Sequence, residues 1–280
     1  MNVVDSHHHV WSLARGDYAW LTPEVGVIYR DFDLEDYARA APQVRASVLV
    51  QAAPTVEETR FLMQVAQGSG GHVLGVVGWV DLDRDDAPAM LAERARVSLL
   101  KSLRPMLQNI EDPEWLLRPR VMRALGALPE LGLRFDALVK VPQLPALLRM
   151  VQAQPSLDVV IDHCGKPDIA NGQWEPWASL VRELAQNPRV HCKLSGLVTE
   201  AGPDWTVDTL SPYVDHVLGN FGAGRVMWGS DWPVVERNGG FDRWWQATQT
   251  LLGPLDDAAR AAILGGNARR FYRLAAATAQ

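Results

Sequence analysis

The 280-residue sequence has few cysteines and no excess of positive charge. Its two cysteines, Cys164 and Cys192, give no disulfide framework, which favours a reducing cytoplasm. With 27 basic and 33 acidic residues, the formal net charge is −6, which argues against nucleic acid or an anionic membrane as a partner. No apolar run approaches the roughly 18 residues of a membrane span, and no signal peptide precedes the first predicted strand. We therefore expect a cytoplasmic protein.

Two common enzyme motifs are also absent. No G-x-G-x-x-G follows the first predicted strand, so a doubly wound, dinucleotide-binding sheet lacks support. Neither a G-x-S-x-G motif nor a serine–histidine pairing is visible, which argues against covalent acyl-enzyme chemistry. What is present is an ordinary globular composition, 48% hydrophobic and 21% charged, with enough length for one large core.

Short β-rich segments recur along the chain, and most are separated by helical patterns. Several are continuously apolar, as strands of a parallel sheet covered on both faces are. We predict strands at 3–10, 46–53, 73–80, 97–104, 133–139, 158–164, 190–196 and 226–232. We predict helices at 54–67, where Thr55 and Glu58 have capping-box spacing, and at 85–96, 118–131, 144–154, 174–186, 207–219 and 261–274. This alternation predicts a single α/β domain over residues 1–280, a (β/α)₈ TIM barrel, with an open doubly wound sheet as the alternative.

Polar residues stand where three of these strands end, and the carboxyl ends of barrel strands form the catalytic face. The first strand lies in "VVDSHHHVW", from Val3 to Trp11. Because strand side chains alternate, His7 and His9 share one face, and we expect His8 to point outward as a structural residue. The sixth strand ends at His163 in "VVIDHCGKP", and the eighth ends at Asp231 in "VMWGSDWP".

Three imidazoles and one carboxylate on one rim suit two kinds of site. They match the ligands of a Zn²⁺ or Mn²⁺ ion, and they equally form a metal-free acid–base cluster. Each residue has a structural alternative when taken alone, as a hydrogen-bonded core histidine or as a helix-capping aspartate. Their occurrence together favours a catalytic site made of His7, His9, His163 and Asp231.

Further candidates surround this cluster. Arg104, at the end of the fourth strand, has a rigid donor fork suited to a substrate oxygen, although an exposed arginine that opens a loop is the alternative. Lys193 shares a face of the seventh strand with Ser195. In the lumen Lys193 must be paired or deprotonated, and a salt bridge to a carboxylate such as Asp5 is the alternative to substrate binding.

Other residues receive simpler interpretations. The positions of Cys164 and Cys192 point both side chains away from the lumen, so we interpret them as buried free thiols. The sequence holds 11 tryptophans, and we assign a pocket-lining role to three of them, with ordinary packing as the alternative: Trp232, Trp79 and Trp115.

Six segments together resemble the amidohydrolase superfamily: "DSHHHVW", "KSLRPMLQ", "DHCGKP", "CKLSGL", "WGSDWPV" and "GNARRFY". The similarity spans nearly the whole chain and is greatest to the branch of sugar-lactone hydrolases and 2-pyrone-4,6-dicarboxylate lactonases. The resemblance implies that His7, His9, His163 and Asp231 form the catalytic cluster and are the ligands of any bound cation. Binuclear members bridge two metals through a lysine on the fourth strand. Lys101 lies before the end of that strand, so we expect at most one divalent cation, Zn²⁺ or Mn²⁺, which some members of the branch do not need.

The resemblance also implies an activity, the opening of a lactone by direct attack of water on its carbonyl. We expect Asp231 to take a proton from a water held by His163, while the histidines stabilise the oxyanion directly or through a cation. Arg104 and Lys193 are the only cationic groups predicted at the site. A neutral sugar lactone therefore fits better than a dicarboxylated pyrone, and we expect an aldonolactone of the L-fucose, L-rhamnose or L-galactose type.

Two other functions remain open at this point. A mononuclear-metal decarboxylase of the same superfamily uses a similar residue set on an aromatic or unsaturated acid and requires its ion. A non-catalytic sugar-binding barrel would bind lactones without turnover. The sequence does not predict the oligomeric state.

Overall fold

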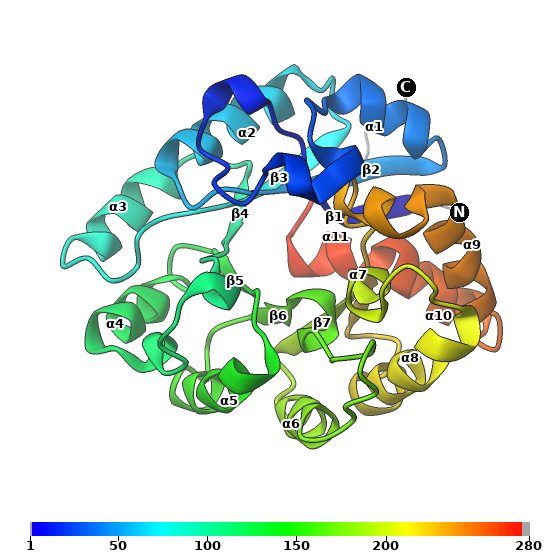
Figure 1. The fold of residues 1–280 in the computed structure, drawn as a ribbon. Coiled ribbons are helices and arrows are strands. Elements are labelled where there is room, and N and C mark those ends of the chain that lie inside the picture. The colour runs from blue at the N-terminus through cyan, green and yellow to red at the C-terminus, as the bar shows by residue number, and fades with distance from the viewer. Residues whose placement is uncertain (1, 276–280) are drawn as a thin grey trace.

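The computed structural model describes residues 2–275 and shows eight parallel strands ringed by helices (Figure 1). Strands that follow one another in sequence are neighbours in the sheet, and β8 approaches β1 again through a parallel bridge between His8 and Trp232. The predicted (β/α)₈ TIM barrel is therefore confirmed, and the open doubly wound sheet is excluded. The strands are β1 Val3–His8, β2 Val44–Val50, β3 Val73–Gly78, β4 Leu100–Leu103, β5 Arg134–Ala137, β6 Val159–Ile161, β7 Val190–Leu194 and β8 Val226–Trp228.

The helices cover the outside of this barrel (Figure 1). They are α1 Leu34–Ala40, α2 Val56–Gly68, α3 Ala87–Arg94, α4 Pro119–Ala127, α5 Leu144–Ala153, α6 Trp177–Leu184, α7 Leu197–Ala201, α8 Val207–Phe221, α9 Gly240–Leu251, α10 Asp257–Ala261 and α11 Asn267–Phe271. The sequence patterns missed α1, α7 and α10, which are too short to show a helical period, and α9, which begins at a glycine. Within residues 2–275, no helix has the length and apolar character needed to cross a membrane.

Residues at the start of α2 make hydrogen bonds to the long connection between β1 and α1. The Thr55 side chain caps the helix by accepting from the Glu58 amide at 3.0 Å, as predicted. Glu58 does not complete a capping box: its carboxylate accepts from the Tyr18 hydroxyl at 2.6 Å and from the Ala52 amide at 3.2 Å. The Trp20 indole donates to the Ala52 carbonyl at 2.7 Å. These bonds hold the connection between β1 and α1 over the end of β2.

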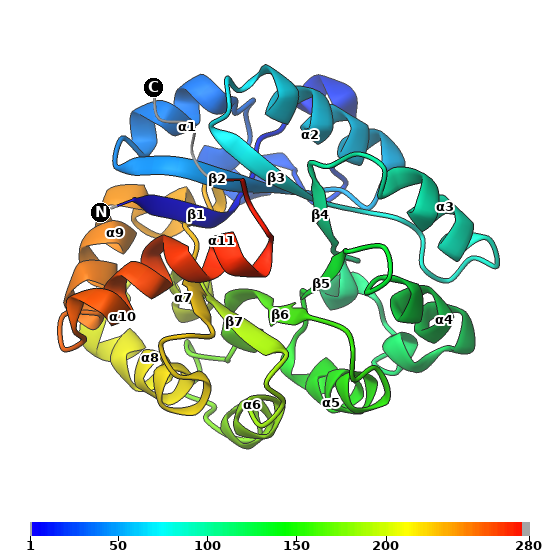
Figure 2. The ribbon, with the colours of Figure 1, turned by 180° about the vertical axis from the view of Figure 1, so that it is seen from behind.

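Two layers of apolar side chains form the core. The outer layer lies between the strands and the helices. The inner layer fills the lumen and includes the closing helix: Val4, Ala46, Val48, Val50, Val77, Val160, Met227, Ala268, Phe271, Tyr272 and Leu274. Figure 2 shows α11 lying across the barrel from behind. The polar residues at the strand ends thus face the other opening, which is the usual catalytic face of this fold.

Strand β1 does not alternate strictly along its length. Val4 belongs to the lumen layer, so strict alternation would also turn His8 inward. The pairing with β2 shifts register between Asp5 and His8, and this irregularity resets the alternation. As predicted, His8 lies outside the lumen, where it stacks on Tyr37 with ring centroids 3.9 Å apart, while His7 faces inward.

Candidate functional site

The structure brings the four predicted cluster residues together at the carboxyl ends of the strands. Atom Oδ1 of Asp231 lies 3.6 Å from Nε2 of His7, 3.4 Å from Nε2 of His9 and 3.9 Å from Nε2 of His163. The His7 ring centroid is 5.0 Å from that of His9 and 4.5 Å from that of His163. All four side chains are buried, so their mutual interactions are only weakly screened by solvent.

Backbone hydrogen bonds between the first and last strands set this convergence. The Asp231 amide donates to the His7 carbonyl at 2.8 Å, and the His9 amide donates to the Trp232 carbonyl at 2.7 Å. Gly229 permits the approach, because a Cβ at that position would lie 2.7 Å from Cβ of His7. The register of β1 against the segment after β8 therefore places both histidines beside Asp231.

Two cluster residues adopt left-handed backbone conformations. His163 has a φ of 53° and Asp231 a φ of 58°, which are unfavourable for residues with a Cβ. Such strain is typical of functional positions held by their surroundings. The surroundings of His163 are tight: a Cβ on Gly196 would lie 2.5 Å from Nδ1 of the imidazole.

Hydrogen bonds at Nδ1 orient two of the imidazoles. Nδ1 of His9 lies 2.7 Å from the Val50 carbonyl, which only accepts, so this nitrogen carries a proton and Nε2 faces Asp231. Nδ1 of His163 is 2.9 Å from the Ser195 hydroxyl, a group that can donate or accept.

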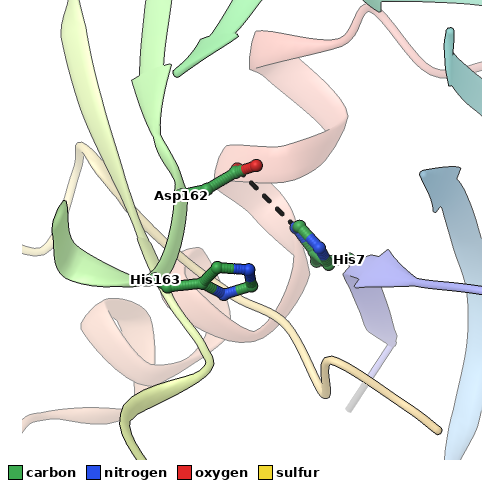
Figure 3. Close-up of side chains that lie close together, drawn as sticks. All are labelled: His7, Asp162 and His163. Carbon is green, nitrogen blue, oxygen red and sulfur yellow. Dashed lines mark ion pairs between the residues drawn. The ribbon is translucent and has the colours of Figure 1, made fainter. Parts of the chain in front are cut away.

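His7 contacts a buried charged network beneath the cluster. Nζ of Lys193 lies 3.1 Å from Nδ1 of His7, 2.5 Å from Asp136 and 2.9 Å from Asp162. Asp162, which points toward His7 in Figure 3, also lies 3.6 Å from Nδ1 of His7 and 3.4 Å from Arg104. An ammonium donates only, so when it bonds Nδ1, a neutral His7 carries its proton on Nε2.

Burial and charge shift the pKa values in this region. Burial alone would raise the pKa of Asp231, but the neighbouring His163, His9 and His7 outweigh it and hold that pKa well below its ordinary value. Burial lowers the pKa of His163 to about 4, although Asp231 opposes the shift. Burial and the ammonium of Lys193 hold the pKa of His7 well below its ordinary value. At neutral pH the cluster is thus an ionised carboxylate among at least two neutral imidazoles.

A cavity of about 200 Å³ opens above the cluster. The sequence predicted four of its lining residues: His9, Arg104, His163 and Asp231. It assigned no role to the others: Trp20, Ala52, Met106, Gln108, Asn109, Leu138, Lys166, Gly196, Thr199, Glu200, Val234 and Arg237. Five of these nevertheless lie in the segments that carry the resemblance: Met106, Gln108, Lys166, Gly196 and Val234.

Of the predicted substrate-binding residues, Arg104 lies at the cavity and the three tryptophans do not line it. Arg104 is buried at the cavity and is not an exposed loop residue. Trp79 and Trp115 line a neighbouring hollow. Trp232 is buried against Phe32, with ring centroids 5.2 Å apart, and is not among the cavity residues.

Lys193 lies below the cavity and does not line it. The alternative of a salt bridge is correct in kind, but Asp5 is the wrong partner. The register shift in β1 turns Asp5 toward Tyr37 and Ser230, whose backbone amide donates to Asp5 at 2.9 Å. The ion-pair partners of Lys193, Asp136 and Asp162, were both missed, although each stands within a predicted strand.

The donor set fits a single divalent cation. Ligand atoms of His7, His9 and Asp231 lie within 4.8 Å of one another, and so do those of His7, Asp162 and His163. Nε2 of His9 lies 3.4 Å from a carboxylate oxygen of Asp231, and a proton or a cation shared by these two atoms would stabilise the pair. His7 joins such a set only in the tautomer that donates its Nδ1 proton to Asp162. Lys101, the second residue of β4, packs against Gly75 and lies before the carboxyl end of its strand.

Comparisons with known proteins agree with this architecture. Residues 4–274 match the family described as Amidohydrolase. A Burkholderia ambifaria protein named L-fucono-1,5-lactonase is 44% identical over 280 residues, covering 97% of this chain and 95% of that protein. A Burkholderia multivorans protein of the same name is 33% identical, covering 97% and 96%. A crystal structure of a Burkholderia multivorans amidohydrolase with bound zinc has 32% identity and a TM-score of 0.90, covering 98% of this chain and 100% of that one. On this evidence, the chain belongs to the amidohydrolase family.

Proposed function

We propose that this protein hydrolyses the lactone of a sugar acid, and that its substrate is an aldono-1,5-lactone. The observation that carries the proposal is the convergence of three imidazole nitrogens on one carboxylate oxygen at the floor of a cavity. The relatives named L-fucono-1,5-lactonase support the choice of a sugar lactone with a six-membered ring.

Asp231 is the general base in the proposed reaction. It is ionised near neutral pH, so it accepts a proton from a water molecule hydrogen-bonded between it and His163. The oxygen of that water adds to the lactone carbonyl. The guanidinium of Arg104, whose Nη1 lies 3.4 Å from Nε2 of His7, stabilises the charge that develops on the carbonyl oxygen. Asp231 then returns the proton to the ring oxygen as the carbon–oxygen bond breaks.

His9, His163 and Asp231, with His7 in its other tautomer, would hold a divalent cation. Such a cation would supply Lewis-acid polarisation at this position, and Zn²⁺ and Mn²⁺ both match the donor types. We propose that the activity does not require it. A lactone needs less activation than an amide, because an alkoxide departs more readily than an amine anion.

The charge balance of the cavity favours a neutral substrate. Two of its three cationic side chains face carboxylates: Arg104 lies 3.4 Å from Asp162, and Lys166 lies 2.6 Å from Glu200. Arg237 makes no ion pair with the residues between 2 and 275. One uncompensated guanidinium suits a polyhydroxylated lactone better than a dicarboxylated pyrone.

A lactone panel tests the proposal. Proton release is followed with a pH indicator on 1,5- and 1,4-lactones of L-fuconic, L-rhamnonic and L-galactonic acids, and on 2-pyrone-4,6-dicarboxylate. We expect a 1,5-aldonolactone to be the best substrate, with activity that persists after treatment with a chelator. Turnover of the pyrone alone would overturn the proposal, and so would binding of lactones without hydrolysis.

The decarboxylase alternative gives a different result in the same experiment. A decarboxylase of this superfamily would release CO₂ from an aromatic acid and lose all activity on chelation. Elemental analysis of the purified protein beside the kinetics separates dependence on a metal from its mere presence.

A further inference from the structure

Two neighbouring loops place an ion pair on the wall of the catalytic cavity. Nζ of Lys166, in the loop after β6, lies 2.6 Å from Oε1 of Glu200 on α7. Their side chains are 16% and 23% exposed, so both stay within reach of a ligand. The same two residues also border a second, broader groove outside the cavity. The pair therefore forms part of the partition between the two hollows.

Groups around this pair have unused hydrogen-bonding capacity. No residue from 2 to 275 makes a hydrogen bond to the second carboxylate oxygen of Glu200. Thr199 also lines the cavity, and its hydroxyl oxygen is buried without a partner among the same residues. An unsatisfied buried polar group costs free energy, and a ligand that supplies the missing partner recovers it.

The ion pair is held rigidly against the catalytic cluster. The Lys166 amide donates to the His163 carbonyl at 2.9 Å, within the left-handed turn that also orients the imidazole. Gly196, at the start of the turn that carries Thr199 and Glu200, packs on the same imidazole. A ligand group bound to Glu200 is thereby fixed relative to the reacting atoms.

An aromatic residue lies across the mouth from this pair. In an eight-stranded barrel β2 and β6 are opposite each other, as Figure 1 shows. Trp20 is bonded over the end of β2, and Lys166 follows β6. Because the Trp20 N–H is occupied by the Ala52 carbonyl, the indole offers the cavity only apolar surface. One side of the cavity therefore suits C–H groups and the other suits hydroxyl groups.

We propose that Glu200, with Lys166 and the Thr199 hydroxyl, forms the subsite that binds the ring hydroxyls of the lactone, and thereby selects polyhydroxylated lactones. This inference rests on the proposed lactonase function. A carboxylate accepts hydrogen bonds from two hydroxyls at once, and the neighbouring ammonium donates to a third oxygen. A lactone without hydroxyls gains nothing from these groups.

The test compares wild type with Glu200→Gln and Thr199→Val on two substrates, a fully hydroxylated aldono-1,5-lactone and δ-valerolactone. Where δ-valerolactone is not turned over, its competitive inhibition constant replaces its KM. We expect Glu200→Gln to lower kcat/KM for the hydroxylated lactone about tenfold or more, mainly through KM, and Thr199→Val to have a smaller effect of the same kind. The kcat/KM for δ-valerolactone, or its inhibition constant, should change less than about twofold.

The matched control is Asp158→Asn. Asp158 forms a comparable ion pair, 2.8 Å from Arg189, at the opposite end of β6, and its loss should leave both substrates unaffected. If Glu200→Gln changes kcat/KM equally for both substrates, or for neither, the proposed subsite is wrong. If Glu200→Gln fails to fold, Thr199→Val and Lys166→Met replace it, and their effects on the hydroxylated lactone and on δ-valerolactone are compared in the same way. Failure of the lactonase function itself is distinct, because the wild type would then hydrolyse neither lactone.

Discussion

The backbone amide of Asp231 donates to the carbonyl of His7 at 2.8 Å, across the seam where the last strand of the barrel meets the first. This bond joins residues that are 224 positions apart in the chain, and it places the carboxylate beside two imidazoles. Four predictions follow from this arrangement and from the contacts that support it.

Asp231→Asn should abolish most of the lactone hydrolysis while preserving the fold. The amide keeps the size of the side chain but cannot accept a proton, so we expect kcat to fall at least about a hundredfold. Circular dichroism and the thermal midpoint should match wild type within a few degrees. Asp158→Asn, at the far end of the barrel, is the control and should keep full activity. Near-normal turnover by Asp231→Asn would rule out the proposed base.

Gly196→Ala should lower kcat more than the control variant Gly202→Ala does. Both glycines have positive φ; an alanine costs about 1–2 kcal/mol of backbone strain at Gly196, and more at Gly202, where the ψ of −176° is accessible essentially to glycine alone. Only at Gly196 does the added Cβ meet the His163 imidazole, at 2.5 Å; at Gly202 it meets nothing within 4 Å. We expect kcat to fall ~10- to 100-fold for Gly196→Ala alone. Equal kinetic effects of the two variants would show that the position of His163 does not matter.

Lys193→Met should cost stability, because it removes the ammonium shared by two buried carboxylates and leaves Asp162 with Arg104 alone. Lys193 contacts Asp136 and Asp162, and all three side chains are fully buried. Removal of one partner of such a network costs about 3–5 kcal/mol of unfolding free energy, which urea denaturation measures. Lys101→Met is the control, since Lys101 is only half-buried beside Arg134, and should cost about 1 kcal/mol or less.

A substrate-binding role for Lys193 predicts the opposite pattern. KM would then rise while the urea midpoint stayed at the wild-type value. The double variant Lys193→Met, Asp136→Asn offers a second check, because neutralising one carboxylate should recover part of the lost stability.

The pH dependence of stability should report on Glu58. Burial raises its pKa to about 7 from an ordinary 4.5, despite opposing bonds from Tyr18 and Ala52. Between these values the folded protein keeps a proton that the unfolded chain releases. The unfolding free energy contributed by Glu58 is thus present below about pH 4.5 and is lost as the pH rises through about 7, on the order of 3 kcal/mol in all.

Glu58→Gln removes this titration and should flatten the pH profile of the thermal midpoint between pH 4.5 and 7. The control is Glu57→Gln, whose side chain is 67% exposed and pairs with Arg60 on the surface, and it should retain the wild-type slope. Identical profiles for the wild type and Glu58→Gln would show that Glu58 is ionised throughout this range.

Most of the fold could be predicted from the sequence, because continuous apolar runs and helical periods report burial directly. All eight strands were predicted, but every predicted segment runs past the observed end of its strand, including the segments at 158–164 and 226–232. The ends of these two segments are the turns that hold His163 and Asp231 in left-handed conformations. A strained turn has no periodic pattern, so sequence reasoning extends the strand through it.

The sequence by itself determined which residue types stand at the strand ends, and therefore the prediction of a cluster made of His7, His9, His163 and Asp231. Only the tertiary structure decided what lies around them. It paired Lys193 with Asp136 and Asp162 instead of Asp5, and it put Trp20, Lys166 and Glu200 on the cavity wall in place of Trp79, Trp115 and Trp232. The physical reason is that a strand period fixes which way a side chain points, whereas its partners depend on register shifts and on loops with no period at all.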